Sequence, residues 1–310
     1  MKVIFMGTPD FAVGALEAIV NAGHDVVLVV TQEDKPKGRG KEIQFTPVKE
    51  SAIKANIPVF QPHRIKDAEA IMKLREYEAD VFVVAAYGQI LSKEILDMPK
   101  YGCVNIHASL LPKYRGAAPI QWSIIDGEKV TGVTTMLMAE GLDTGDMIEK
   151  VQVEITDDET GGSLHDKLME AGSKLILSTL EKLEKGLATY TVQDDSLSCY
   201  AKMLDKKLGN IDFSKSAVQI ERLIRGLNPW PSAYTSYKGK TLKIWKADVI
   251  ENEYEGQLGQ IVETTKKSVV VKTGKGALAI TELQLEGKKR MTTEAFLCGA
   301  GFDEGTVLGQ

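Results

Sequence analysis

The feature that most constrains the fold is a series of short, continuous apolar runs in the first half of the chain. These Val- and Ile-rich runs lie at residues 3–6, 26–30, 81–85 and 104–106, and amphipathic stretches at residues 11–21 and 68–77 come between them. Continuous apolar strands separated by helices are typical of a parallel sheet with both faces covered. We therefore predict an α/β fold with a parallel sheet, two further strands at residues 133–138 and 147–153, and a long helix at 163–183.

A different pattern follows residue 206. A helix is predicted at residues 217–227, and short alternating segments follow at 241–247, 259–263, 268–273 and 278–285. Short strands at intervals of about 8–12 residues indicate a small sandwich or barrel. The chain has 310 residues, which exceeds the ~250–300 at which single cores stop growing. We expect an α/β domain at residues 1–189, a linker at 190–205 and a smaller β-barrel of the oligonucleotide-binding type at 206–310.

Charge and composition limit the functional classes. The net charge is −5, yet the chain from residue 206 onward carries 16 Lys and Arg against 12 Asp and Glu. This local positive balance suggests that one domain meets an anionic partner. Three widely spaced cysteines predict neither a disulfide framework nor a metal site. The start has no signal-peptide layout, and no apolar run reaches the ~18 residues of a membrane span, so we expect no membrane partner and a cytoplasmic protein.

Three polar residues form the strongest candidate for a reaction site. Asn105 and His107 are two residues apart on a predicted strand, so their side chains share one face. Asp143 lies in the segment Gly-Leu-Asp-Thr-Gly, where glycines allow a sharp turn. An amide can stabilise an oxyanion, an imidazole can move a proton, and a carboxylate can orient the imidazole. With no Ser or Cys in a nucleophile motif, the set suits direct attack of an amine on a carbonyl.

Each of these residues also has a purely structural interpretation. A single strand Asn is more often a capping or turn group, a single His is more often structural, and an Asp between glycines is more often a turn former. Their occurrence together favours the functional interpretation. The sequence leaves open whether His107 or a water bound to Asp143 takes the proton of the amine.

Two loops are candidates for ligand contact. The segment at residues 7–12, Gly-Thr-Pro-Asp-Phe-Ala, follows the first strand, where α/β sheets place ligands, but it lacks the spacing of a dinucleotide fingerprint. Residues 35–41 carry four positive charges, on Lys35, Lys37, Arg39 and Lys41. This segment is either a solvated basic loop or a contact for phosphate groups.

With these motifs assembled, the chain resembles the methionyl-tRNA formyltransferase family over nearly its whole length. The matching segments are residues 7–12, G-R-G-K at 38–41, A-Y-G-Q-I-L at 86–91, the seventeen-residue motif N-I-H-A-S-L-L-P-K-Y-R-G-A-A-P-I-Q at 105–121, G-L-D-T-G-D at 141–146 and N-P-W-P-S-A-Y at 228–234. The motif at 105–121 is specific for folate-dependent formyl transfer. The basic loop and the second domain narrow the resemblance to the branch that acts on tRNA.

The resemblance implies a formyltransferase-type catalytic domain that takes 10-formyltetrahydrofolate as formyl donor, and a barrel that holds tRNA. The acceptor would be the α-amino group of methionyl initiator tRNA, as needed for translation initiation. It implies three groups of site residues: the catalytic set Asn105, His107 and Asp143; the folate contacts Ser109, Leu110, Leu111, Pro112, Ala86, Tyr87 and Gly88; and the tRNA contacts Lys35, Lys37, Arg39 and Lys41. We expect a monomer.

The sequence leaves three rival functions to consider. A folate-dependent formyltransferase acting on a nucleotide or an amino sugar would use the same three polar residues, but it leaves the basic loop and the basic barrel without a purpose. A nucleotide-binding oxidoreductase is compatible with the sheet, but the glycine fingerprint is missing from the sequence. An RNA-binding protein with a degenerate catalytic domain is disfavoured by the intact set of Asn105, His107 and Asp143.

Overall fold

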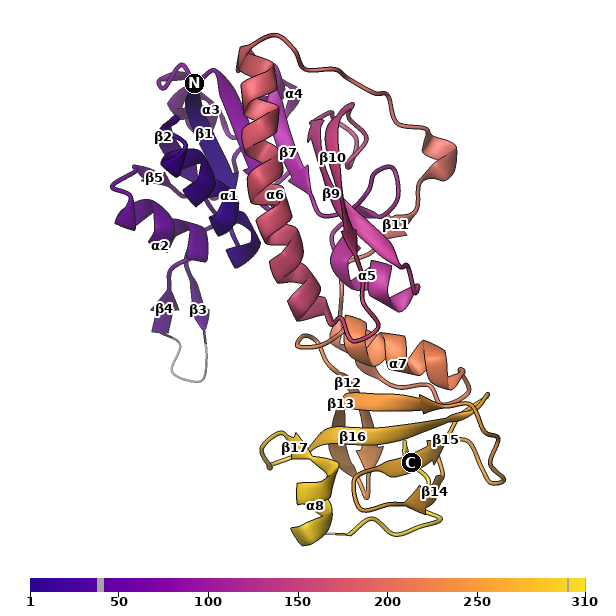
Figure 1. Ribbon diagram of the computed structural model, residues 1–310. Coiled ribbons are helices and arrows are strands. Elements are labelled where there is room, and N and C mark those ends of the chain that lie inside the picture. Colours follow the sequence, from indigo (N-terminus) through magenta and orange to yellow (C-terminus); the bar gives the residue numbers. More distant parts are fainter. Residues whose placement is uncertain (38–41, 300, 310) are drawn as a thin grey trace. The chain divides into compact units, whose positions relative to one another are not determined.

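The computed structural model of the protein describes residues 1–37, 42–299 and 301–309 (Figure 1). The chain divides into two compact units, and each is described by itself. The first unit contains residues 1–119, 130–154 and 165–201; the second contains residues 120–129, 155–164 and 202–310.

The first unit is built on a mixed sheet, which within the described residues has seven strands. In spatial order these are β10 (Met147–Glu154), β9 (Val130–Leu137), β7 (Cys103–His107), β6 (Val81–Ala85), β1 (Lys2–Gly7), β2 (Asp25–Val30) and β5 (Val59–Phe60). The five strands from β7 to β5 pair in parallel, which confirms the prediction for that part. β9 pairs antiparallel with both β7 and β10. The sheet is therefore mostly, not wholly, parallel.

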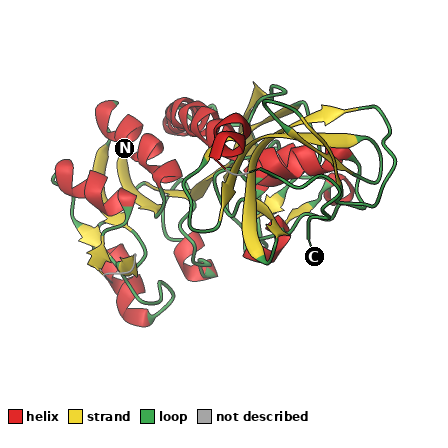
Figure 2. Cartoon of the chain, turned by 90° about the horizontal axis from the view of Figure 1, so that it is seen from below, coloured by secondary structure: helices red, strands yellow, loops and turns green. Residues whose placement is uncertain are grey.

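Helices cover both faces of this sheet (Figures 1 and 2). On one face lie α1 (Asp10–Asn21) and α6 (Gly161–Glu184), and on the other α3 (Ala68–Arg75) and α4 (Lys93–Leu96). Gly172 of α6 packs so closely on Ile106 that a Cβ there would lie 3.1 Å from the Ile106 Cγ2. Cys103, two and four residues before Asn105 and His107, belongs to the core on the α3 and α4 face. The two polar residues therefore share a face opposite α6.

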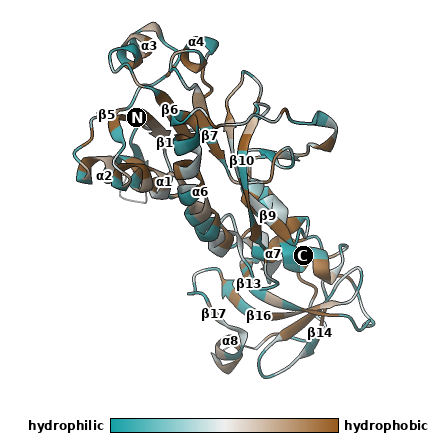
Figure 3. Cartoon of the chain, turned by 45° about the horizontal axis from the view of Figure 1, so that its top comes forward, coloured by the Kyte–Doolittle hydropathy of each residue, from teal (hydrophilic) through white to brown (hydrophobic). Residues whose placement is uncertain are grey.

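Burial on both faces explains why the sequences of the central strands are continuous apolar runs. Every residue of β6 and β7 is buried, including the polar residues at the end of β7. Figure 3 shows hydrophobic colouring on both strands. Two helices of the first unit went unpredicted: α2 (Pro47–Lys54), whose N-terminus is capped by the Thr46 hydroxyl, and the single turn α4. Each is short, so its periodicity is weak in the sequence.

Short paired segments complete the first unit. β3 (Lys35–Lys37) pairs antiparallel with β4 (Glu42–Gln44). β8 (Arg115–Gly116) pairs in parallel with β11 (Tyr200–Ala201). The segment after α6, predicted to be an irregular connector, thus contains a short strand, and it also contains the 3-10 helix η1 (Asp195–Leu197).

The second unit contains an antiparallel sheet, and its strands overlap the four alternating segments predicted from the sequence. Its elements are α5 (Pro119–Ile125), η2 (Lys206–Gly209), α7 (Ala217–Gly226), β12 (Ala233–Tyr237), β13 (Lys240–Ile250), β14 (Ile261–Thr264), β15 (Val269–Lys272), β16 (Ala277–Leu285), β17 (Met291–Thr292) and α8 (Thr293–Gly299). The strand order is β12-β13-β16-β15-β14, with β17 beside β16. Ile220 and Ile224 of α7 enter the core of this sheet.

Two strands and two helices of the second unit were missed in the sequence, namely β12, β17, α5 and α8. β12 alternates buried and partly buried residues, but its buried positions are Ala233, Thr235 and Tyr237. Two of these three side chains carry hydroxyl groups, so the period of two did not register as an apolar pattern.

Candidate active site

Two of the three candidate residues, Asn105 and His107, lie near the end of β7 with their side chains on one face of the strand. Asn105 pairs with Val84 on β6 and Met136 on β9, and His107 pairs with Thr134 on β9. Strands on both sides thus fix the backbone of β7. Asn105 is 8% exposed and His107 6%, so both side chains are nearly withdrawn from water. Within the described residues, the Asn105 side-chain amide makes no hydrogen bond to the protein.

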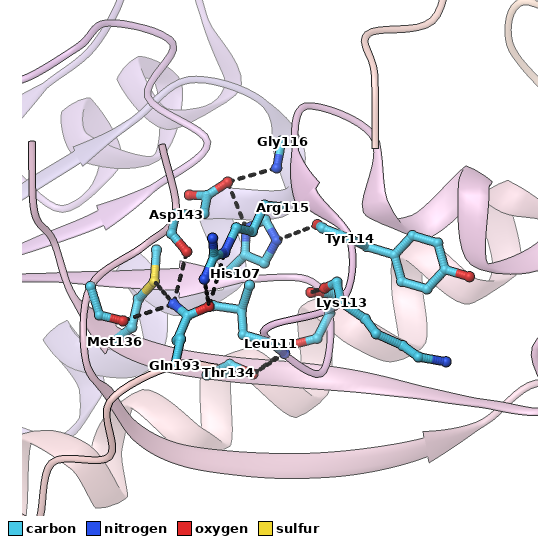
Figure 4. Close-up of polar contacts among 12 residues, drawn as sticks. His107, Leu111, Lys113, Tyr114, Arg115, Gly116, Thr134, Met136, Asp143 and Gln193 are labelled. Atoms are coloured by element: carbon cyan, nitrogen blue, oxygen red, sulfur yellow. Dashed lines mark hydrogen bonds and ion pairs between the residues drawn. The ribbon is translucent and has the colours of Figure 1, made fainter. Parts of the chain in front are cut away.

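The environment of His107 fixes the roles of its two ring nitrogens. Nε2 lies 2.8 Å from the carbonyl oxygen of Tyr114. A carbonyl can only accept, so Nε2 carries the hydrogen in the neutral imidazole. Nδ1 then keeps its lone pair, and it faces Asp143 Oδ2 at 3.7 Å (Figure 4). The nitrogen able to receive a proton is the one beside the carboxylate.

Asp143 reaches this position from the loop between β9 and β10. Its backbone φ of 52° lies in the left-handed region, and its carboxylate accepts a hydrogen bond from the Gly116 N–H at 2.8 Å. Gly145 is required for the loop path, because a Cβ there would lie 1.6 Å from the Leu137 carbonyl oxygen. Gly145 is therefore needed for a close approach to the Leu137 backbone, while the left-handed conformation in this loop belongs to Asp143 itself.

Sequence reasoning missed two residues that hold this loop. Gln193, from the segment after α6, donates from Nε2 to the carbonyl oxygens of Asp143 and Gly145, each at 2.8 Å. Its Oε1 accepts from Arg115 Nε at 3.1 Å and from Arg115 Nη2 at 2.9 Å (Figure 4). Arg115 stands inside the motif at 105–121, but Gln193 lies in a stretch with no periodic pattern. No sequence signal pointed to it.

The segment Ser109–Pro112, expected to contact folate, is tied to β9 and β10. The Thr134 hydroxyl accepts from Leu111 N–H at 3.2 Å and donates to the Ser109 carbonyl oxygen at 2.7 Å. Lys150 Nζ donates to the Leu111 carbonyl oxygen at 2.6 Å. Burial lowers the pKa of the Lys150 ammonium.

The side chains of this segment divide into two groups. Ser109 and Leu111 are buried, and Leu111 packs with Met136 and Met147. Leu110 and Pro112 are partly exposed. The latter two are therefore the side chains of this segment that can meet a ligand.

The segment Ala86–Gly88 follows β6 at the same end of the sheet. Ala86 and Gly88 have positive φ values of 46° and 88° and are exposed. The Tyr87 side chain instead packs in the core, where burial raises the pKa of its phenol. The Tyr87 carbonyl oxygen accepts from Thr8 Oγ1 at 2.9 Å and Gln32 Nε2 at 3.2 Å. Contact between Tyr87 and a ligand would therefore come from its backbone.

The basic segment is only partly described. Lys35 is exposed on β3 and lines a cavity of about 290 Å³ whose other walls include Thr8, Gln32 and Phe45. Lys37 ends β3, and Arg39 and Lys41 lie outside the described residues. Within the described chain, no group of three or more His, Cys, Asp or Glu side chains is arranged to hold a metal ion. Nor do the described residues include a helix of the length and apolarity that crossing a membrane requires.

Comparison with known proteins gives consistent results over the whole chain. Residues 1–180 match the formyl transferase family, and residues 203–301 match the formyl transferase C-terminal domain. The methionyl-tRNA formyltransferase of Agathobacter rectalis is 59% identical over 99% of both chains. That of Lachnospira eligens is 55% identical over the full length of both.

Solved structures share the fold. An N-formyltransferase from Helicobacter canadensis, in complex with folinic acid and dTDP-3-aminofucose, superposes with a TM-score of 0.69 at 20% identity, covering 94% of this chain and all of that one. HypX from Aquifex aeolicus, in complex with tetrahydrofolic acid, gives 0.64 at 17% identity, covering 96% of this chain and 47% of that one.

Proposed function

This chain belongs to the methionyl-tRNA formyltransferase family, and we propose that it transfers the formyl group of 10-formyltetrahydrofolate to the α-amino group of methionyl initiator tRNA. The product would serve translation initiation. The observation that carries the chemical part of this proposal is the position of His107 Nδ1, which faces Asp143 Oδ2 at 3.7 Å with Asn105 on the same face of β7.

The proposed reaction is direct attack by the amine on the formyl carbon. A free α-amino group has a pKa of about 7.7–8.0, so part of it is neutral near pH 7. Asn105, whose amide makes no hydrogen bond within the described protein, donates to the formyl oxygen as negative charge develops there. A new C–N bond forms to the amine, and the bond between the formyl carbon and the folate nitrogen then breaks.

His107 and Asp143 handle the proton in this scheme. Because Nε2–H is committed to the Tyr114 carbonyl, Nδ1 takes the proton that the amine loses. Asp143 stabilises the imidazolium that forms, and the proton then passes to the departing folate nitrogen. The proposal thus assigns proton transfer to His107 Nδ1 rather than to a water bound to Asp143, the alternative that the sequence left open.

The remaining parts of the chain are assigned to substrates. We place folate against Ser109–Pro112 and the exposed backbone of Ala86–Gly88, which border the carboxyl ends of β7 and β6. We assign tRNA to the basic segment with Lys35, Lys37, Arg39 and Lys41 and to the domain at residues 206–310, as a barrel of the oligonucleotide-binding type. Residues 1–189 would be the catalytic domain and 190–205 the linker, in a cytoplasmic monomer.

The test is a formylation assay with purified protein and 10-formyltetrahydrofolate. Charged initiator methionyl-tRNA, charged elongator methionyl-tRNA and dTDP-3-aminofucose are supplied as separate acceptors. Formylation of the initiator species, with much less of the elongator species, is expected. Formylation of neither tRNA would contradict the proposal, whereas equal formylation of both would contradict only its specificity. Formylation of the amino sugar alone would favour the rival acceptor class.

A further inference from the structure

A buried glutamine, Gln193, is hydrogen-bonded to the backbone of the Asp143 loop and has no assigned role. Gln193 is 7% exposed, although it belongs to the segment after α6 rather than to the sheet. The backbone on either side is anchored: Thr191 exchanges two hydrogen bonds of 2.9 Å with Met147, and β11 pairs with β8. The position of the Gln193 side chain is therefore set by backbone contacts on both sides.

The hydrogen bonds of Gln193 use the full capacity of its amide. A primary amide has two N–H donors and two acceptor lone pairs. Both donors are used on the carbonyls of Asp143 and Gly145, Nε2 also lies 3.8 Å from the weak acceptor Met136 Sδ, and Oε1 receives two N–H groups from Arg115. Arg115 can only donate and a carbonyl can only accept, so the amide has one allowed orientation. A glutamate of the same shape would satisfy Arg115 but would turn an acceptor toward two carbonyls.

These bonds act on the backbone whose conformation aims the carboxylate. Asp143 has a left-handed φ of 52°, which is uncommon for residues with a Cβ, although Asp adopts it more readily than most. Gln193 holds the carbonyls of Asp143 and of Gly145, two residues later, while the Gly116 N–H holds the carboxylate itself. Loss of the Gln193 donors would release the backbone of the Asp143 loop. The Asp143 carboxylate and His107 would remain chemically unchanged.

We propose that Gln193 is a positioning residue that sets the Asp143 carboxylate beside His107, with Arg115 fixing the orientation of the Gln193 amide. This inference rests on the proposed role of Asp143. Gln193 bonds the backbone carbonyls of Asp143 and Gly145, so it acts on the reaction only through the position of Asp143.

The test compares Gln193→Glu with Asp195→Asn in the full-length protein. Asp195 also bonds Arg115, at 2.7 Å, but its side chain is 81% exposed and does not touch the Asp143 loop. Gln193→Glu should lower kcat about 10- to 50-fold and leave both KM values within about twofold, because misplacement of a reacting group affects the chemical step. Asp195→Asn should behave as wild type. Wild-type kcat in Gln193→Glu would overturn the inference.

A double-mutant cycle separates positioning from a general structural effect. If Gln193 acts through Asp143, Gln193→Glu should change kcat less than about twofold in an Asp143→Asn background. An equal loss in both backgrounds would overturn the inference. Wild-type turnover in Asp143→Asn alone would instead contradict the role of Asp143, and a wild-type protein that formylates no tRNA would contradict the proposed function.

Hydrogen exchange tests the same inference without measuring turnover. The Gly116 amide donates to the Asp143 carboxylate, so its hydrogen exchange reports whether that carboxylate stays in place. Exchange should accelerate in Gln193→Glu and not in Asp195→Asn; unchanged exchange in Gln193→Glu would overturn the inference. If Gln193→Glu does not fold, Gln193→Asn keeps the amide but shortens its reach, and the same acceleration is expected.

Discussion

The Asp143 loop and the β3–β4 hairpin present polar groups in opposite ways. Asp143 is held by the Gly116 N–H on its carboxylate and by Gln193 on its backbone, and it faces a buried imidazole. Lys35 on the hairpin is exposed, and the hairpin is a two-stranded pair separate from the main sheet. Groups proposed to move a proton need a fixed geometry, since a misplacement of about 1 Å can cost about 100-fold in rate. Charges proposed to attract a polyanion need only be accessible.

The largest effect should come from the fixed groups. Asn105→Ala and Asp143→Ala are each expected to lower kcat at least about 100-fold, because each removes a group that acts in the transition state. Steady-state formylation of initiator methionyl-tRNA measures this. Unchanged circular dichroism and thermal midpoint serve as the control for folding. Near-wild-type turnover in either variant would remove that residue from the mechanism.

A smaller effect should follow from loosening the Ser109–Pro112 segment. Thr134→Val keeps the shape of the side chain but removes its bonds to Leu111 and Ser109. We expect the KM for 10-formyltetrahydrofolate to rise about 5- to 10-fold, since a net hydrogen bond contributes about 1 kcal/mol. Thr134→Ser retains the hydroxyl and should restore most of the affinity. Equal KM values in the valine and serine variants would separate this hydroxyl from folate binding.

A still smaller effect is expected at the hairpin. Lys35→Ala should raise the KM for tRNA about 2- to 5-fold without changing kcat, and it should reduce the slope of log affinity against log salt by about one. Titrations at several salt concentrations test this. Lys174→Ala removes one positive charge from α6, where Lys174 pairs with Glu170, and should leave the slope unchanged. Equal slopes in wild type and Lys35→Ala would show that the Lys35 charge does not contact phosphate.

Glu149 should affect stability and not turnover. Burial would raise the pKa of its carboxyl, but hydrogen bonds from Lys182, Thr179 and Ser178 outweigh burial and lower the pKa below its ordinary 4.5. Since the folded pKa is depressed, the stabilisation is complete above 4.5 and is lost as the pH falls through the folded value. Glu149→Gln should cost about 1–2 kcal/mol near neutrality.

Urea unfolding of wild type and Glu149→Gln, followed from neutral into acidic solution, tests this dependence. The difference in unfolding free energy should shrink as the pH drops below 4.5. Glu170→Gln, at an exposed ion pair with Lys174, is the matched control and should leave stability nearly unchanged. A Glu149 difference that does not vary with pH would exclude the ionised carboxylate as its source.

Much of the fold was predictable because buried strands require apolar residues, and these are visible in the sequence. Parallel strands covered on both faces must be continuously apolar, so β1, β2, β6 and β7 were recognisable. The direction of β9 was not, because strand direction depends on chain connections rather than on residue type. β12 was missed since its inward positions include Thr235 and Tyr237, which carry hydroxyl groups.

By itself the sequence determined the α/β organisation of the first domain, the series of short strands in the second, the shared face of Asn105 and His107, and the glycines on either side of Asp143. Those features follow from local rules: strand parity, apolar periodicity and the absence of a side chain on glycine. Only the tertiary structure decided that Asp143 Oδ2 faces His107 Nδ1, that Nε2–H is bound to Tyr114, and that Gln193 holds the loop from behind. Gln193 is 50 residues from Asp143 along the chain. Such contacts arise from how distant segments pack, and no local pattern encodes them.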